Sequence, residues 1–260
     1  MITLIKRCFI VDSEKLLINR FTELASRSCG KGIYAFSDFL TLSEQNVLLR
    51  LRFPAGCSPF SLEGGYELAE RRIAVFGSEE ICGRGYEPPF SVVAVRPKSE
   101  KFSDALTHRD FLGALMSLGV KRETMGDIAV TENTGYVICL KPVAGFILKE
   151  LLRIKHTSVE CEPLEELPRL AFLTPEEKSV NVPSARTDAV ISAVFKLSRS
   201  ESLELFKKER VFINGRLTTD PGREPSVGEI VSVRGYGRFK YNGVERSTKK
   251  DRLFVSVSVY

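Results

Sequence analysis

The stretch RTDAVISAVFKLSRSESLELFKKERVFING, residues 186–215, decides the fold of the last third of the chain. Its apolar residues recur at helical spacing, which predicts one helix over 187–195 and a second over 199–209. A short apolar run at 211–213 then predicts a strand, and the Asn-Gly pair at 214–215 predicts a type I′ turn that reverses it. Two helices followed by a hairpin therefore begin a C-terminal α+β module.

The start of the second predicted helix has the residue types of a phosphate site. Ser198 is a good N-cap residue, and Arg199 would project from the first turn. Free backbone amides, the helix dipole and a guanidinium would then favour an anion at the same place. Lys207 and Lys208 lie two turns further on and extend the positive face.

Arg186 and Asp188, at the start of the first predicted helix, admit two interpretations. Arg186 either contacts a phosphate or forms an ion pair that supports the fold, and both alternatives stay open for it. Asp188 is assigned mainly to the ion pair.

A second candidate surface follows in RGYGRFKY, residues 234–241. It partly matches the octapeptide of RRM domains, but position five is Arg238 instead of an aromatic residue, so we reject that identity. Its glycines allow close backbone approach, and Tyr236 or Phe239 could stack on a base. The alternative is a glycine-containing loop with a buried Phe239. The basic residues of this surface are Arg234, Arg238 and Lys240.

The charge of the chain is concentrated in the same module. Residues 182–260 contain 15 Lys and Arg against 9 Asp and Glu, whereas residues 1–181 contain 23 against 24. The formal net charge of +5 therefore comes from one basic module on a nearly neutral body. Phosphate is the commonest partner of such a module, because each neutralised phosphate releases condensed counterions.

The rest of the chain predicts two further regions and a linker. Residues 1–74 are expected to be mainly helical, residues 75–164 to form an α+β domain, and residues 165–182, with their acids and prolines, to be a linker before 183–260. The middle segment has the order β-α-β-β-α-β of a ferredoxin-like unit. Helices are predicted at 13–24, 107–118 and 142–151 and from Ser37 and Ser43; the second has Thr107 as N-cap and Asp110 at N3. Strands are predicted at 73–76, 90–95, 128–131, 136–140, 156–162, 229–233 and 253–259. The charged group at 70–72 is interpreted as a solvated helix face.

The C-terminal pattern resembles the S4 RNA-binding domain. That family has Arg-Leu-Asp, then Ser-Arg, an apolar-rich helix and Val-x-Val-Asn-Gly. Thr187 stands where Leu is usual, and Glu209-Arg210 stands where a Gly commonly ends the helix, which puts the geometry of that helix end in question. The residues kept are Arg186, Asp188, Ser198, Arg199, Asn214 and Gly215.

Upstream segments resemble the YlmH family. They are GGYELAERR at 64–72, HRDFLGAL at 108–115, and the stretch from LGVKR to GDI within 118–128. With the C-terminal segments, the match covers nearly the whole chain. The resemblance implies a bacterial cytoplasmic protein with a helical N-terminal region, an RRM-like middle domain and an S4 domain.

The YlmH resemblance also implies a function. It predicts a protein that binds ribosomal RNA or tRNA on the large ribosomal subunit during ribosome-associated quality control, in which a stalled nascent chain receives a C-terminal tail. The family is also associated with cell-division genes. The predicted RNA-binding residues are Arg186, Ser198, Arg199, Lys207, Lys208, Asn214, Arg234, Tyr236, Arg238 and Lys240.

Two other functions compete with RNA binding alone. An RNA-modifying enzyme or its accessory would need a catalytic constellation, and the body shows neither a cofactor loop nor the Gly-Arg-Leu-Asp motif of pseudouridine synthases. His108 and His156 are interpreted as structural. A cell-division scaffold would need an exposed apolar partner surface, and none stands out beyond ordinary core faces.

Composition narrows the remaining possibilities. The six cysteines form no CxxC pair, which favours free thiols in a reducing compartment over a disulfide framework or a zinc site. No apolar stretch approaches the roughly 18–20 residues that span a bilayer. We therefore expect a cytoplasmic monomer with no catalytic residue, metal, cofactor or membrane contact.

Overall fold

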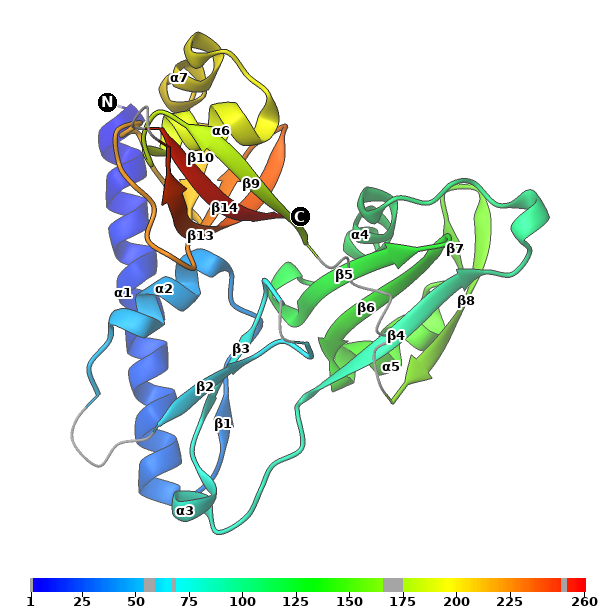
Figure 1. Cartoon of the computed structure of the whole chain (residues 1–260). Coiled ribbons are helices and arrows are strands. Elements are labelled where there is room, and N and C mark those ends of the chain that lie inside the picture. Colours follow the sequence, from blue (N-terminus) through cyan, green and yellow to red (C-terminus); the bar gives the residue numbers. More distant parts are fainter. Residues whose placement is uncertain (1, 54–58, 67–68, 166–174, 249–251) are drawn as a thin grey trace. The chain divides into compact units, whose positions relative to one another are not determined.

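The chain folds as two compact units, Met1–Phe172 and Leu173–Tyr260 (Figure 1). Both units combine helices with antiparallel sheets, so the chain has the α+β class that the sequence predicts. This computed structural model describes residues 2–53, 59–66, 69–165, 175–248 and 252–260.

The first unit begins with a long helix and a small sheet. Helix α1 (Ile2–Lys31) is followed by α2 (Leu42–Arg50). Strands β1 (Ala35–Phe36), β3 (Ile73–Phe76) and β2 (Phe60–Glu63) pair in that order. The region predicted as mainly helical therefore also contains a three-stranded sheet. The strand predicted at 73–76 belongs to this sheet and not to the one that follows.

Local hydrogen bonds explain where the helices of this region begin. Helix α1 extends well beyond the predicted 13–24 on both sides. Thr41 caps α2 through a capping box with Glu44. Ser37 does not begin a helix, because its N–H donates to the carbonyl of Ala74 and its hydroxyl accepts from the N–H of Ala74. Ser37 thus continues the pairing with β3.

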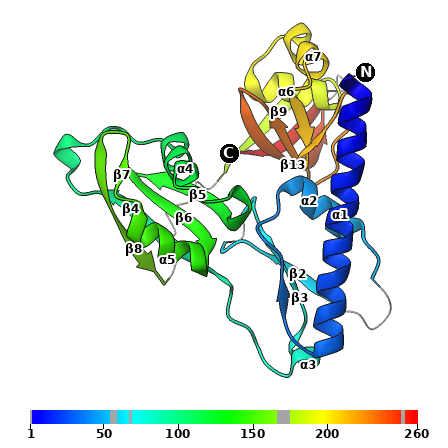
Figure 2. The same cartoon turned by 180° about the vertical axis from the view of Figure 1, so that it is seen from behind.

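Residues 90–164 form a five-stranded antiparallel sheet in the order β5-β6-β4-β8-β7 (Figure 2). Thr107 and Asp110 form the predicted capping box at the start of α4. A short helix α3 (Glu79–Cys82) precedes this sheet. The elements are β4 (Phe90–Pro97), α4 (His108–Ser117), β5 (Met125–Thr131), β6 (Thr134–Leu140), α5 (Lys141–Glu150), β7 (Arg153–Ile154) and β8 (Thr157–Leu164), with 3-10 turns at Glu100–Phe102 and Arg122–Thr124.

Both faces of this middle sheet carry packed apolar side chains. On one face, residues such as Val93 and Val137 share a core with Phe111 of α4 and Ile147 of α5. The alternate residues pack against the N-terminal region, and the ring centroids of Phe39 and Phe90 lie 5.8 Å apart. This second cluster contains the buried side chains of Phe39, Ile73, Val75, Val92 and Ile138. The N-terminal region therefore covers part of the sheet face that α4 and α5 leave free.

Asp127 joins the same two regions through hydrogen bonds. Its carboxylate accepts from the hydroxyl of Tyr66 at 2.7 Å and from the backbone N–H groups of Glu70 and Arg71 at 2.7 and 3.2 Å. Burial raises the pKa of Asp127, and these hydrogen bonds oppose the shift. The Gly-Asp pair of one family-like segment thus contacts the GGYELAERR segment, in which residues 67 and 68 lie outside the described part.

Arg71 is buried, with 8% of its surface exposed, so the interpretation of residues 70–72 as a solvated helix face is wrong. Its guanidinium donates to the carbonyl groups of Met125, Phe39 and Arg122 at 2.9, 2.8 and 3.2 Å. These carbonyl groups and the Asp127 carboxylate compensate a buried cation, which would otherwise be costly. Sequence pattern alone does not separate this arginine from a surface one.

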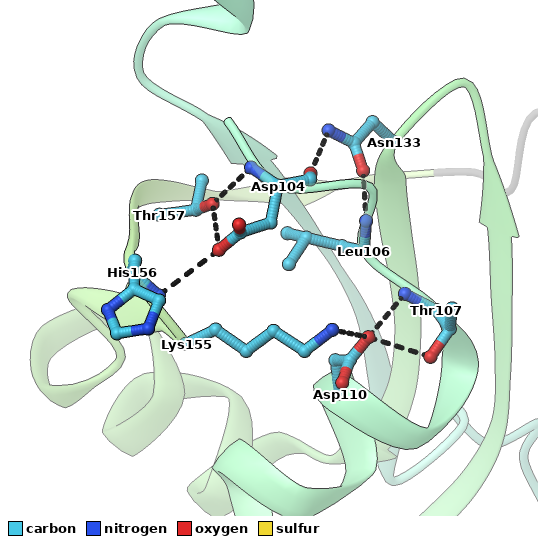
Figure 3. Close-up of polar contacts among 8 residues, drawn as sticks. All are labelled: Asp104, Leu106, Thr107, Asp110, Asn133, Lys155, His156 and Thr157. Atoms are coloured by element: carbon cyan, nitrogen blue, oxygen red, sulfur yellow. Dashed lines mark hydrogen bonds and ion pairs between the residues drawn. The ribbon is translucent and has the colours of Figure 1, made fainter. Parts of the chain in front are cut away.

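A polar network fixes the loop before α4 to two hairpins of the middle sheet (Figure 3). Asn133 accepts from the N–H of Leu106 at 2.7 Å and donates to the carbonyl of Asp104 at 2.9 Å. The Asp104 carboxylate in turn accepts from the backbone N–H of His156. The other residues of the network are Thr107, Asp110, Lys155 and Thr157.

The second unit is a six-stranded antiparallel sheet, in the order β11-β10-β12-β13-β14-β9, with two helices. The core contains Val190 and Ile191 of α6 and Leu205 and Phe206 of α7. Its elements are β9 (Glu176–Val182), α6 (Thr187–Phe195), α7 (Arg199–Lys207), β10 (Val211–Ile213), β11 (Arg216–Leu217), β12 (Ile230–Val233), β13 (Gly237–Ser247) and β14 (Leu253–Val259).

Two segments of this unit differ from prediction. Part of the predicted linker 165–182 lies outside the described residues, at 166–174, but its end forms β9 and pairs with β14 from Val182↔Leu253 to Glu176↔Val259. Val182 is buried in the core. Burial and strand pairing therefore decide the structure of this segment, although its acidic and proline-rich composition predicted a linker. The segment 234–241, for which a glycine-containing loop with a buried Phe239 was one of two alternatives, is mostly strand β13, because Phe239 and Tyr241 alternate into the same core.

Candidate nucleic-acid interface

Arg186 forms the ion pair that was one of its two predicted alternatives. Its Nε and Nη2 donate to the two carboxylate oxygens of Asp188 at 3.0 and 3.1 Å. The Asp188 side chain is only 3% exposed, whereas that of Arg186 is 40% exposed. A guanidinium has five N–H donors. Arg186 can therefore hold Asp188 and still present donors to an anion.

Arg186, Arg199 and Arg252 line one pocket of about 380 Å³. Arg252 was not among the predicted site residues. Its guanidinium donates to the side-chain and backbone oxygens of Asn181 in β9, and both residues line the pocket. Asp188 is the one acidic residue in the pocket lining, and its carboxylate is already paired. Three guanidinium groups around one pocket suit a phosphate group.

The amides at the start of α7 are less available than predicted. Ser198 accepts from the N–H of Glu201 at 3.2 Å, and the Glu201 carboxylate accepts from the N–H of Ser198 at 2.7 Å. Hydrogen bonds from Ser198 lower the pKa of Glu201, so this carboxylate stays ionised at neutral pH. A carboxylate thus occupies part of the predicted anion position. Ser198 has a capping role, and Arg199 is the cation that this helix start presents to the pocket.

Lys207 and Lys208 lie at the other end of α7. A helix of nine residues separates its ends by about 12 Å, which is a little more than two turns. Lys207 is exposed and pairs with Glu204 at 2.7 Å. These lysines therefore extend the basic surface away from the pocket and do not complete it.

Arg238 and Lys240 lie on the opposite side of the sheet from the pocket helices. In β13, Phe239 and Tyr241 face the core that α6 and α7 cover, so the alternate residues point the other way. Phe239 is fully buried, which confirms the alternative of a buried ring and excludes stacking of Phe239 on a base. Phe212 lies opposite Ser232 in the register, and Ser232 lies opposite Arg238, so Phe212 is on the same side as Arg238. The guanidinium of Arg234 lies 4.5 Å from the ring centroid of Phe212, which places Arg234 on this side as well.

Tyr236 and Asn214 have structural contacts of their own. The Tyr236 ring is partly exposed and lies 6.0 Å from that of Phe195 at the end of α6, on the helix side. Asn214 and Gly215 have φ values of 47° and 73°, which confirms the predicted turn. The Asn214 side chain also accepts from the N–H of Ile230 at 2.9 Å and so joins the hairpin to β12. The other predicted residues thus divide between the helix side of the sheet and the opposite side, and Asn214 lies in the turn.

Comparison with known proteins identifies the family. Residues 90–167 match the family model described as "Putative RNA-binding domain in YlmH". The chain is 31% identical over 222 residues, 85% of each chain, to "Ribosome-associated protein quality control protein P2" of Bacillus subtilis. The chain belongs to the YlmH family. This membership confirms the resemblance inferred from the sequence.

A solved structure of the YlmH family is also similar. "Cell division protein ylmH from Streptococcus pneumoniae" is 18% identical to this chain, with a TM-score of 0.46, over 58% of this chain and 91% of that one. The YlmH family model covers the middle sheet, for which sequence reasoning assigned no RNA-binding residue.

Two further observations bear on the site. None of the helices in the described residues is long and apolar enough to cross a membrane. Among the same residues, no group of His, Cys, Asp and Glu side chains is placed to hold a metal ion.

Proposed function

We propose that this protein is a noncatalytic RNA-binding protein that contacts ribosomal RNA or tRNA on the large ribosomal subunit, in the quality control of stalled nascent chains. The pocket lined by Arg186, Arg199 and Arg252 carries the proposal, because it combines three guanidinium groups with one already paired carboxylate. Family membership and the name of the Bacillus subtilis relative support the ribosomal setting.

The proposal also assigns three regions to the chain, which we propose to be a cytoplasmic monomer. We assign the residues before β4 to an N-terminal region, 90–164 to a ferredoxin- or RRM-like domain and 176–260 to an S4 domain, because β3 pairs in the N-terminal sheet and β9 in the C-terminal one. The strand order β5-β6-β4-β8, with α4 after β4 and α5 after β6, supports the middle assignment. Two helices followed by the Asn214-Gly215 hairpin support the last one.

Co-sedimentation with purified large ribosomal subunits tests the proposal. The wild type should sediment with the subunit, more strongly when peptidyl-tRNA is present. Arg199→Ala and Arg252→Ala should weaken binding and each reduce the slope of log affinity against log salt by about 1, because each removes one phosphate contact. Arg50→Ala, which removes the same charge from α2, is the matched control and should bind as the wild type does.

The design separates the outcomes. Equal loss in Arg199→Ala and Arg50→Ala would show that net charge alone drives binding and would exclude the pocket. Absence of subunit binding by the wild type would exclude the ribosomal role.

A further inference from the structure

We propose that the C-terminal sheet binds unpaired RNA bases on its side opposite α6 and α7, as a second site distinct from the arginine pocket. This inference rests on the proposed RNA-binding function and adds the class of RNA that the second surface takes. We call this surface the stacking face. It consists of Phe212, Arg234, Arg238, Arg246, Phe254 and Tyr260.

The strand register places these residues on one side of the sheet. Phe212 pairs with Ser232, which pairs with Arg238, and Arg246 pairs with Phe254. Residues that oppose each other in adjacent strands point to the same side, and Tyr260 follows Phe254 by six positions, an even offset. The intervening Val255 and Val257 are buried in the core with α6 and α7.

Three arginine–aromatic stacks cover this side. The guanidinium carbons of Arg234, Arg238 and Arg246 lie 4.5, 4.9 and 4.4 Å from the ring centroids of Phe212, Tyr260 and Phe254, respectively. A stacked guanidinium is held flat while its N–H donors point outward in its own plane. Bases stack both on aromatic rings and on guanidinium planes, so each pair offers a platform beside donors for phosphate.

The remaining residues of this side favour a polar, anionic ligand. Lys240 pairs with Ser258, and Asn242 donates to the hydroxyl groups of Ser256 and Ser258 at 3.4 and 2.8 Å. Two acidic residues lie on this side. Glu177 is opposite Ser258 in the strand register, and the Glu245 carboxylate accepts a hydrogen bond from the Ser179 hydroxyl. Among the described residues named here, four cations therefore stand against two carboxylates. That composition suits nucleic acid better than a protein partner.

Unpaired RNA fits this surface better than a duplex does. The bases of an A-form duplex are stacked inside the helix, so a protein contacts mainly its phosphates and 2′-hydroxyl groups. Aromatic rings add affinity only where a base is free to stack. Such rings lie on this side of the sheet, whereas the three guanidinium groups of the arginine pocket stack on no ring within the described part of the chain.

Two RNA probes and the full-length chain test the inference. One probe is a ten-nucleotide single strand with a central 2-aminopurine, and the other is a hairpin closed by a short tight loop. Phe254→Leu/Tyr260→Leu removes two rings but keeps all charges. This variant should bind the single strand about tenfold or more weakly, because stacking contributes that much per base, and its salt slope should not change.

Arg199→Ala is the matched variant for the opposite side of the sheet. It should weaken hairpin binding and reduce the salt slope, while the 2-aminopurine fluorescence change that reports stacking remains. Tyr260→Phe, combined with intact Phe254, should bind like the wild type because the ring is kept. Thermal unfolding of each variant shows whether the fold is retained.

The outcomes distinguish this inference from the proposed function. If the double Leu variant binds both probes like the wild type, the stacking face is not an RNA site, and RNA binding through the pocket can still stand. Equal loss on single strand and hairpin would also overturn stacking, since it would indicate phosphate contact alone. If the wild type binds neither probe nor the ribosomal subunit, the proposed function itself fails.

Discussion

The middle sheet and the C-terminal sheet differ in what their second face carries. In the middle sheet, Val92 and Ile138 of that face are buried against Phe39 and other N-terminal side chains. In the C-terminal sheet, the equivalent positions hold arginines, Lys240 and half-buried rings. The second face of the middle sheet therefore anchors a neighbouring region, whereas we propose that the second face of the C-terminal sheet binds a ligand.

This difference limits how the middle sheet can contact RNA. An RRM binds RNA by stacking bases on the free face of its sheet. Here Phe39, Ile73 and Val75 pack on part of that face. RNA contact by residues 90–167 therefore requires surfaces other than this covered part, such as the helices or the strand edges.

Removing a side chain from the covered face should have the largest effect. Phe39→Ala should lower the free energy of unfolding by about 3–5 kcal/mol, because a fully buried ring is lost and a cavity remains. Lys240→Ala, at a position of the other sheet's second face, should change it by no more than about 0.5 kcal/mol. Urea denaturation of both variants measures the contrast. Equal effects would show that the two faces do not differ as described.

The polar contacts between the N-terminal region and the middle sheet should come next. Asp127→Ala should cost about 3 kcal/mol, since it leaves the buried Arg71 without its carboxylate and Tyr66 without its acceptor. Thermal unfolding measures the loss. Asp38→Ala, which removes an exposed partner of Arg20, is the control and should cost less than about 1 kcal/mol. A loss at Asp127 as small as at Asp38 would contradict the buried network.

The helices that cover the two sheets end with the same geometry but different residues. After α4, Gly119 has a φ of 84° and its N–H donates to Met116. After α7, Glu209 takes the same position with a φ of 53°, and its N–H donates to Phe206. The position where the sequence departs from the S4 pattern thus keeps the left-handed conformation that glycine favours.

Glu209→Gly should therefore stabilise the protein by about 1 kcal/mol, because glycine adopts a positive φ without strain. Glu204→Gly, inside α7, should destabilise it by about 1 kcal/mol and serves as the control. The midpoint of urea unfolding gives both values. A loss of stability in Glu209→Gly would show that contacts of the glutamate side chain stabilise the fold by more than the positive φ of its backbone destabilises it.

The smallest effect concerns the capping box of α4. Hydrogen bonds from Lys155 and Thr107 lower the pKa of Asp110 to about 2. Because the folded pKa lies below the unfolded value, this group adds stability above about pH 4. That stability is lost as pH falls toward 2. Asp110→Asn should flatten this part of the unfolding profile between pH 4 and 2, and an unchanged profile would contradict the assignment.

Local signals account for what sequence reasoning predicted correctly. The Asn-Gly turn at 214–215, the Thr107 capping box and both C-terminal helices depend on residues within a few positions of each other. The sequence interpretation missed β9 and the three-stranded sheet, whose strands pair with segments far along the chain. Arg71 was misplaced for the same reason, since Asp127 and Met125 are distant in sequence.

The sequence by itself determined the basic C-terminal module and the family. Only the tertiary structure decided that Arg252 joins Arg186 and Arg199 at one pocket, and that the other predicted arginines lie across the sheet. The physical reason is the sequence distance over which each property is determined. Charge and periodicity are properties of short stretches, whereas strand pairing and burial depend on partners that the chain brings together only when it folds.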